Sequence, residues 1–307
     1  MLPDGEVRQL ERGQRLFVVA DRKATRAFRW AFEGASALRS GRRRWRATGP
    51  APAAWATRLD EPECADPAEV ANLLRRFAQG LGAPVRLAYS GGSSVRQTLG
   101  VAHSSRPQHA AYWALTGDAV AGPWTLPLGR SGRGDGLDTL RDGAVLSQLR
   151  AELLALASAR PAPAGEIAVV LAPAAAALIA HEAVGHLAEA SAAPVALGTR
   201  VAAEPLSFID DPLAAGGPAR YDVDDEGIRT LGPTRLVHDG RLVAHLHSRA
   251  SASVAGAWPT ANGRSASVLD DPLPRMSNLV CAAGELADGA LVDALWSGLY
   301  VHRLADG

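Results

Sequence analysis

The segment at residues 181–186, His-Glu-Ala-Val-Gly-His, constrains the fold of this chain more than any other. It follows an apolar stretch at 167–171, which predicts a short strand, and an alanine-rich run from Pro173, which predicts a helix. On a regular α-helix, side chains five residues apart point about 140° apart, whereas a four-residue spacing leaves about 40°. A π-type bulge would make the two histidines neighbours, and Gly185 is the residue that we expect to permit it.

Two imidazoles brought together in this way suit a zinc ion, because histidine nitrogen is one of its usual ligands. Glu182 lies beside the first histidine and would act as general base on a water that the metal makes more acidic. The pattern therefore predicts a metal site at His181 and His186, with Glu182 as the catalytic group for amide hydrolysis. The alternative is that these three side chains serve packing alone.

The same segment resembles the TldD/PmbA family, whose catalytic members carry His-Glu-Ala-Val-Gly-His on a helix after an apolar strand. Further matches to the family occur in the family's order, over roughly residues 164 to 300. They are Ser-Phe-Ile-Asp-Asp at 207–211, Asp-Val-Asp-Asp-Glu-Gly at 222–227, an Asp-Gly turn at 239–240, Pro-Thr-Ala-Asn-Gly-Arg at 259–264 and Pro-Arg-Met-Ser-Asn at 274–278.

The resemblance implies a zinc-dependent peptidase that acts on unfolded or extended peptides. Carried over to this sequence, His181 and His186 would bind Zn²⁺ and Glu182 would activate water. The resemblance also implies a dimer, formed by two copies or with a related TldD/PmbA subunit that lacks the histidine motif. The competing hypothesis is a non-catalytic partner or scaffold subunit with an incomplete metal site.

A third zinc ligand is not fixed by the sequence, although catalytic zinc usually has three protein ligands. In catalytic family members this ligand is a cysteine from a C-terminal segment, and the present sequence ends at Gly307 before an equivalent of that segment. Cys281, Glu189 or a partner chain are the alternatives. We expect Cys281 to be a small buried side chain, and Glu189 to support the ligands or lie at the surface.

The remaining pattern predicts an α+β fold in two parts. In residues 1–163 we expect a strand near 15–20 and a helix that begins after the N-cap Asp66. Three strands at 85–90, 93–104 and 109–117 would form an antiparallel meander, followed by a second helix through Val145, Leu149 and Leu153. The prolines at 161–163 predict the boundary.

Residues 164–307 are predicted to form a mostly antiparallel, barrel-like β domain that carries the motif helix. Its clearest element is a hairpin at 234–247, where Asp239 and Gly240 supply a two-residue turn.

Composition excludes several classes of protein. The 32 basic and 32 acidic residues balance, which argues against a dedicated nucleic-acid binder, and we expect the arginines at 42–46 to form a solvated loop. Two cysteines cannot make a disulfide framework, and neither a secretory leader nor a membrane span is apparent, so we expect a cytoplasmic protein. No serine-hydrolase elbow or phosphate-binding loop occurs.

Three other groups of residues were candidates for function. The histidines of the hairpin, His238, His245 and His247, are expected to be surface or supporting residues rather than metal ligands. The acidic run Asp222, Asp224 and Glu226 opens like a calcium loop, but Pro233 stands at its closing position, so a solvated hairpin end is expected. The turn at Asn262, Gly263 and Arg264 would line a substrate groove, with Arg264 binding a peptide carboxylate or carbonyls.

Overall fold

The structure is a computed structural model that describes most of the chain. The described residues are 6–20, 25–39, 46–47, 65–100, 108–190, 195–266, 270–286, 289–302 and 304. The arginines at 42–44, Cys64 and most of the Gly/Pro/Arg-rich stretch at 41–52 lie outside them.

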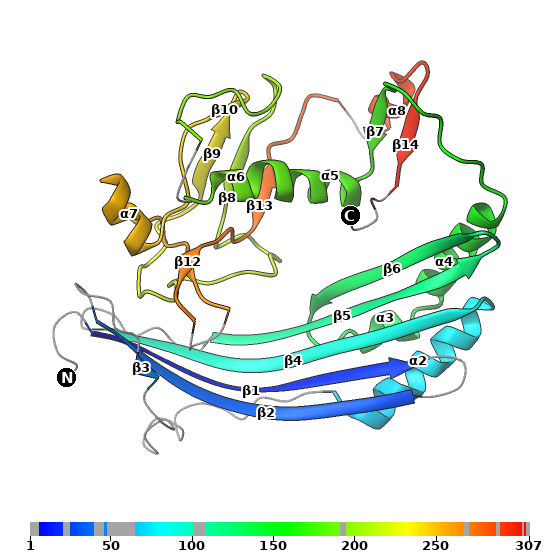
Figure 1. Ribbon diagram of the computed structural model, residues 1–307, viewed down its shortest axis with the longest axis horizontal. Helices are drawn as coiled ribbons and strands as arrows, with labels where there is room; N and C mark the ends of the chain where they lie inside the picture. Colours follow the sequence, from blue (N-terminus) through cyan, green and yellow to red (C-terminus); the bar gives the residue numbers. More distant parts are fainter. Residues whose placement is uncertain are drawn as a thin grey trace.

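The first part of the chain forms a long, curved antiparallel sheet (Figure 1). Its strands are β1 (Glu6–Ala20), β2 (Thr25–Arg39), β3 (Arg46–Ala47), β4 (Val85–Gly100), β5 (Gln108–Ala121) and β6 (Trp124–Arg133), in the order β3-β2-β1-β4-β5-β6. An antiparallel meander is present as predicted, but it is formed by β4, β5 and β6 rather than by the three predicted segments, and it is part of a larger sheet.

The expected break at the Gly-Gly pair is wrong, because β4 runs through Gly91 and Gly92 without interruption. Both glycines lie under aromatic rings: a Cβ at Gly91 would collide with the Tyr89 side chain, and one at Gly92 would lie 2.8 Å from the Tyr112 hydroxyl. The pair thus marks a site of close ring packing on a strand rather than a turn.

Three helices pack against the sheet: α2 (Pro67–Leu81), α3 (Leu137–Arg141) and α4 (Gly143–Ala157). Alternation along β4 turns Val85, Leu87 and Tyr89 into the core beneath these helices. Arg86 and Ala88 face a cavity on the other side of the same strand. The sheet therefore separates a hydrophobic core from the space below the second part of the molecule.

Helix α2 begins where the sequence predicts. The Asp66 side chain accepts a hydrogen bond from the backbone N–H of Ala68, Pro67 is the first helical residue, and Gly82 closes the helix with φ of 70°. Its apolar face is buried at Val70, Leu74, Phe77 and Leu81.

The second part of the chain lies over the other face of the sheet (Figure 1). It contains a four-stranded antiparallel sheet of order β10-β9-β8-β13 and one parallel pair, β14 with β7. The strand bounds are β7 Val169–Leu171, β8 Phe208–Asp210, β9 Thr234–His238, β10 Arg241–Leu242, β13 Leu279–Cys281 and β14 Leu299–Val301, with β11 Gly263–Arg264 and β12 Leu273–Pro274 as a separate pair. The helices are α5 Pro173–Ala180, α6 His186–Ala188, α7 Arg249–Ala255 and α8 Ala290–Asp293.

These elements confirm a mixed α+β fold with mostly antiparallel strands. The hairpin turn is as predicted, with φ of 48° at Asp239 and 73° at Gly240. In the described residues the four-stranded sheet is open rather than closed on itself, with β10 and β13 as its edges. No helix in the described ranges is long and apolar enough to cross a membrane.

Removing the cap of α2 tests how this helix supports the sheet. We expect Asp66→Ala to lower the free energy of unfolding by about 1 kcal/mol, because an N-terminal N–H loses its acceptor. Thermal or urea unfolding followed by circular dichroism measures the change. Asp66→Asn keeps a capping oxygen and should stay close to wild type, and equal losses in both variants would contradict the capping role.

Candidate metal centre

The motif histidines lie on one helical segment whose hydrogen bonding changes at the motif. Helix α5 is regular to Ala180, a π-helical turn follows at His181–Gly185, and α-helix resumes at His186. The backbone N–H of His186 donates to the carbonyl of His181, five residues earlier. The predicted bulge is confirmed, and it turns residues 181 and 186 toward the same side of the helix.

His181, Glu182 and His186 come together at the exposed surface of this turn. One ligand atom from each lies within 4.8 Å of the others, and the two imidazole centroids are 4.7 Å apart. Two imidazoles and a carboxylate are a donor set that zinc accepts. Within the described ranges no other His, Cys, Asp or Glu side chains form such a group.

Glu189 does not join this group but fixes one of its members. One carboxylate oxygen lies 3.1 Å from Nδ1 of His186 and 3.0 Å from the guanidinium of Arg275. The other oxygen accepts the backbone N–H of Met276 at 3.1 Å. Holding Nδ1 leaves Nε2 of His186 as the nitrogen for a metal, which is how carboxylates commonly orient histidine ligands.

Gly185 is required by packing as well as by the bulge. Its φ is −63°, a conformation open to any residue, but an added Cβ would overlap Sδ of Met276. Met276 is buried and belongs to a core with Val184, Ala188 and Leu246. Sequence reasoning placed Gly185 correctly and missed Met276, because a contact between residues 91 positions apart leaves no local pattern.

A buried polar network holds the Met276 segment in place. Asp210, fully buried, accepts the backbone N–H and the hydroxyl of Ser277, each at 2.7 Å, and the side-chain amide of Asn262 at 2.7 Å. Burial raises the pKa of Asp210, and these three donors act in the opposite direction. Asn278 extends the network, since its side chain bonds the backbone of Asp211 and Ala219.

The acidic run is a correction to the sequence prediction. Asp222 is exposed, but Asp224 and Glu226 are buried, so the run is not a solvated hairpin end. Asp224 accepts the backbone N–H groups of Glu226, Ile228 and Gly263 at 2.8–3.0 Å. Desolvation raises its pKa to about 7. The run organises the loop around residue 263 rather than holding a cation.

The remaining candidates take other positions. The expected buried position of Cys281 is wrong, because this residue is exposed on β13, and it stands outside the group of possible metal ligands. The imidazole of His245 donates to the carbonyl of Val195 at 2.9 Å, His247 contacts Ser251, and His238 is exposed beside Asp239. As expected for supporting residues, none of these histidines joins the group of His181 and His186.

The three residues of the predicted turn at 262–264 have different roles. Asn262 is buried in the Asp210 network and Gly263 donates to Asp224, so both are structural. Arg264 lies over the ring of Tyr221 and lines a cavity, and its binding of a peptide stays a prediction.

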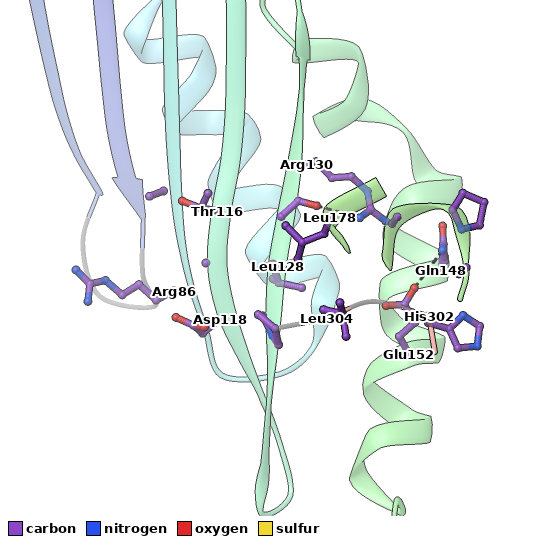
Figure 2. A pocket seen from close by; sticks show the side chains of 17 residues that line it. Arg86, Thr116, Asp118, Leu128, Arg130, Gln148, Glu152, Leu178, His302 and Leu304 are labelled. Atoms are coloured by element: carbon purple, nitrogen blue, oxygen red, sulfur yellow. Dashed lines mark hydrogen bonds between the residues drawn. The ribbon is translucent and has the colours of Figure 1, made fainter. Parts of the chain in front are cut away.

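A larger cavity of about 900 Å³ adjoins the motif helix (Figure 2). It lies between the face of the sheet that carries Arg86, helix α4 and the start of α5. Leu178 of α5 lines it and precedes His181 by three residues, so the cavity reaches to within one helical turn of the motif. Its charged and polar lining includes Arg86, Asp118, Arg130, Glu152 and His302.

Comparison with known proteins matches residues 164–307 to the PmbA/TldA metallopeptidase C-terminal domain. A metalloprotease of Methanocaldococcus jannaschii is 34% identical over 183 residues, which cover 57% of this chain and 40% of that protein. A zinc metalloprotease TldD homolog of Saccharolobus solfataricus is 29% identical over 167 residues, covering 51% of this chain and 37% of that protein. The chain thus spans roughly two fifths of the length of these relatives.

The whole chain also has a known fold. It is similar to TldE from Thermococcus kodakarensis, with a TM-score of 0.70 and 13% identity over 99% of this chain and 80% of that structure. At this identity the likeness concerns the fold, and it includes the curved sheet that the family model does not cover.

Filling the space at Gly185 tests the packing of the π-helical turn. We expect Gly185→Ala to lower the free energy of unfolding by about 1–3 kcal/mol, because the new methyl group overlaps Met276. The double variant with Met276→Ala should lose less unfolding free energy than the sum of the losses in the two single variants, and chemical unfolding measures all three. Gly143→Ala, where nothing lies within 4 Å, is the matched control, and strictly additive losses would argue against the contact.

Asp224→Asn tests the buried carboxylate. Either orientation of the amide turns an NH₂ group toward a backbone N–H, so we expect unfolding free energy to fall by about 1–3 kcal/mol. A pKa near 7 means that the folded state keeps the proton where the unfolded chain has lost it. The resulting stability is complete below about pH 4 and is lost as the pH rises to about 7.

The variant should therefore remove part of the decline in stability between these pH values, and unfolding at several pH values measures it. The exposed Asp222→Asn should reproduce the wild-type curve. A wild-type slope in Asp224→Asn would show that another group titrates.

Proposed function

Because residues 164–307 belong to the TldD/PmbA family, we propose that this chain is a zinc-dependent peptidase that hydrolyses unfolded or extended peptides. The observation that carries the proposal is the π-helical turn, which brings His181, Glu182 and His186 within 4.8 Å of one another at an exposed surface. The metalloprotease names of the relatives support it. The substrate class and the residue roles are part of the proposal.

In this proposal His181 and His186 hold the zinc ion, and Glu189 keeps the His186 ring oriented through Nδ1. Zinc, when bound, polarises the peptide carbonyl and lowers the pKa of water. Glu182 accepts the proton of the attacking water and delivers it to the nitrogen of the leaving amine. The exposure of its carboxylate and its closeness to both imidazoles support this role.

Two features near the motif favour an extended substrate. The cavity beside α5 provides space for a chain between the sheet and the motif helix (Figure 2). Strand β13 is an edge of the four-stranded sheet, and an extended peptide can add to such an edge through backbone hydrogen bonds. Backbone binding of this kind demands no single sequence.

The proposal includes assembly with a second copy or with a related TldD/PmbA subunit. The fold likeness to TldE supports a related subunit. Among the described residues the group of possible ligands holds two imidazoles and the Glu182 carboxylate, so a partner is one source of a third ligand. The division of the chain at residue 163 remains a prediction.

Metal content and hydrolysis test the proposal together. We expect about one zinc per chain by elemental analysis, lost in His181→Ala because one of two imidazoles is removed, and kept in Glu182→Gln. Hydrolysis of an unfolded protein substrate should fall by about 10²-fold or more in Glu182→Gln, since the proton acceptor is gone.

His238→Ala is the matched control, because His238 is an exposed histidine outside the cluster. It should retain zinc and activity. Zinc without hydrolysis in the wild type, alone and with a related subunit, would favour the non-catalytic scaffold instead. Absence of zinc after addition of metal at neutral pH, both in the chain alone and with a related subunit, would refute the proposed site.

A further inference from the structure

A second cavity, of about 350 Å³, lies where the sheet meets the loops of the second part. Strands β4 and β5 form one wall, and residues 218–221 and 223–225 with 264–266 form the other. The two walls are tied together, since Arg96 of β4 makes two 2.9 Å bonds to the carboxylate of Asp225. The cavity is therefore a fixed feature of the fold.

The lining of this cavity is strongly cationic. Four arginines border it, Arg96, Arg133, Arg220 and Arg264, against two acids, Asp224 and Asp225. Asp225 is already paired with Arg96, and the carboxylate of Asp224 accepts three backbone N–H groups. Within the described ranges, neither acid forms a hydrogen bond with Arg133, Arg220 or Arg264.

Among the described residues, the hydrogen bonds of those three arginines all go to backbone carbonyls. Arg133 donates to Gly217 at 3.2 Å, Arg264 donates to Met276 at 2.8 Å, and Arg220 donates to Leu213. A guanidinium has several further N–H donors arranged as a planar fork. The cavity thus presents unused forks whose geometry matches a carboxylate.

A hydroxyl group adds to this set of donors. Ser265 borders the cavity, and its buried Oγ has no hydrogen-bond partner among the described residues. A buried hydroxyl without a partner costs free energy, which an anionic oxygen within its reach would recover.

The cavity is linked to the motif helix through a single residue. Arg264 binds the carbonyl of Met276, the N–H of Met276 binds Glu189, and the side chain of Met276 packs against Gly185. A group held by Arg264 is therefore held in a fixed relation to the π-helical turn.

We propose that this cavity binds a carboxylate of the peptide, either its C-terminal carboxylate or an acidic side chain, through Arg133, Arg220 and Arg264. The proposal rests on the proposed function for the peptide nature of the ligand. Bound here, the carboxylate anchors one end of an extended chain while the rest lies toward His181 and His186. The enzyme would then select peptides by the position of a negative charge rather than by sequence.

Binding of matched peptides tests this proposal without any requirement for zinc or hydrolysis. One dye-labelled neutral sequence is prepared with a free C-terminal acid, with a C-terminal amide, and as an amide with one internal Glu in place of Gln. Fluorescence anisotropy with the full chain in the Glu182→Gln background gives the dissociation constants. We expect the dissociation constant of the free acid or of the Glu peptide to be at least about tenfold lower than that of the neutral amide, because hydrogen bonds to a charged group are stronger than those between neutral groups.

Arginine variants locate the effect. Arg133→Gln and Arg220→Gln should each reduce the preference for the carboxylate several-fold, since each removes a guanidinium from an exposed side chain at the cavity. Arg235→Gln, an exposed arginine on β9 away from the cavity, should keep the full preference. Thermal unfolding confirms that each variant is folded.

Each outcome decides a point. Preference for the free acid assigns the cavity to the C-terminus, and preference for the Glu peptide assigns it to an acidic side chain. Equal binding of all three peptides, or a preference unchanged by both cavity variants, overturns the proposal. Such a result would not contradict the proposed peptidase function, which the zinc and hydrolysis measurements test separately.

Discussion

One additional residue in a helical turn is the constraint on which the candidate centre depends. The bond from the His186 N–H to the His181 carbonyl converts two diverging side chains into neighbours 4.7 Å apart. The turn can pack only because Gly185 leaves room for Met276. Backbone geometry and tertiary packing therefore meet at a single position, which explains a glycine in the middle of an alanine-rich helix.

The buried acids supply the frame that keeps Met276 at that position. Asp210 binds both the backbone and the side chain of Ser277, and Glu189 binds the backbone of Met276. Burying carboxylates is costly, and each of these is compensated by several donors. The segments that match the family in order are thus largely structural, while only the helix carries the proposed chemistry.

Local patterns predicted what local forces determine. The cap at Asp66, the turn at Asp239 and the bulge at Gly185 depend on a few neighbouring residues, and all three are confirmed. Gly92 packs against the ring of Tyr112 and Asp224 binds the backbone of Gly263, both distant in sequence, and the predictions failed there. A run of acids looks solvated until the backbone donors that surround it are known, and a single sequence does not reveal them.

The ion pair between Arg96 and Asp225 joins residues 129 positions apart and crosses between the sheet and the loops above it. A fragment that begins at residue 164, where the family match begins, would keep the acid and discard its cation. Asp225, a largely buried carboxylate, would then be left without its ion-pair partner, so we expect the isolated fragment to be less stable than the same residues in the whole chain.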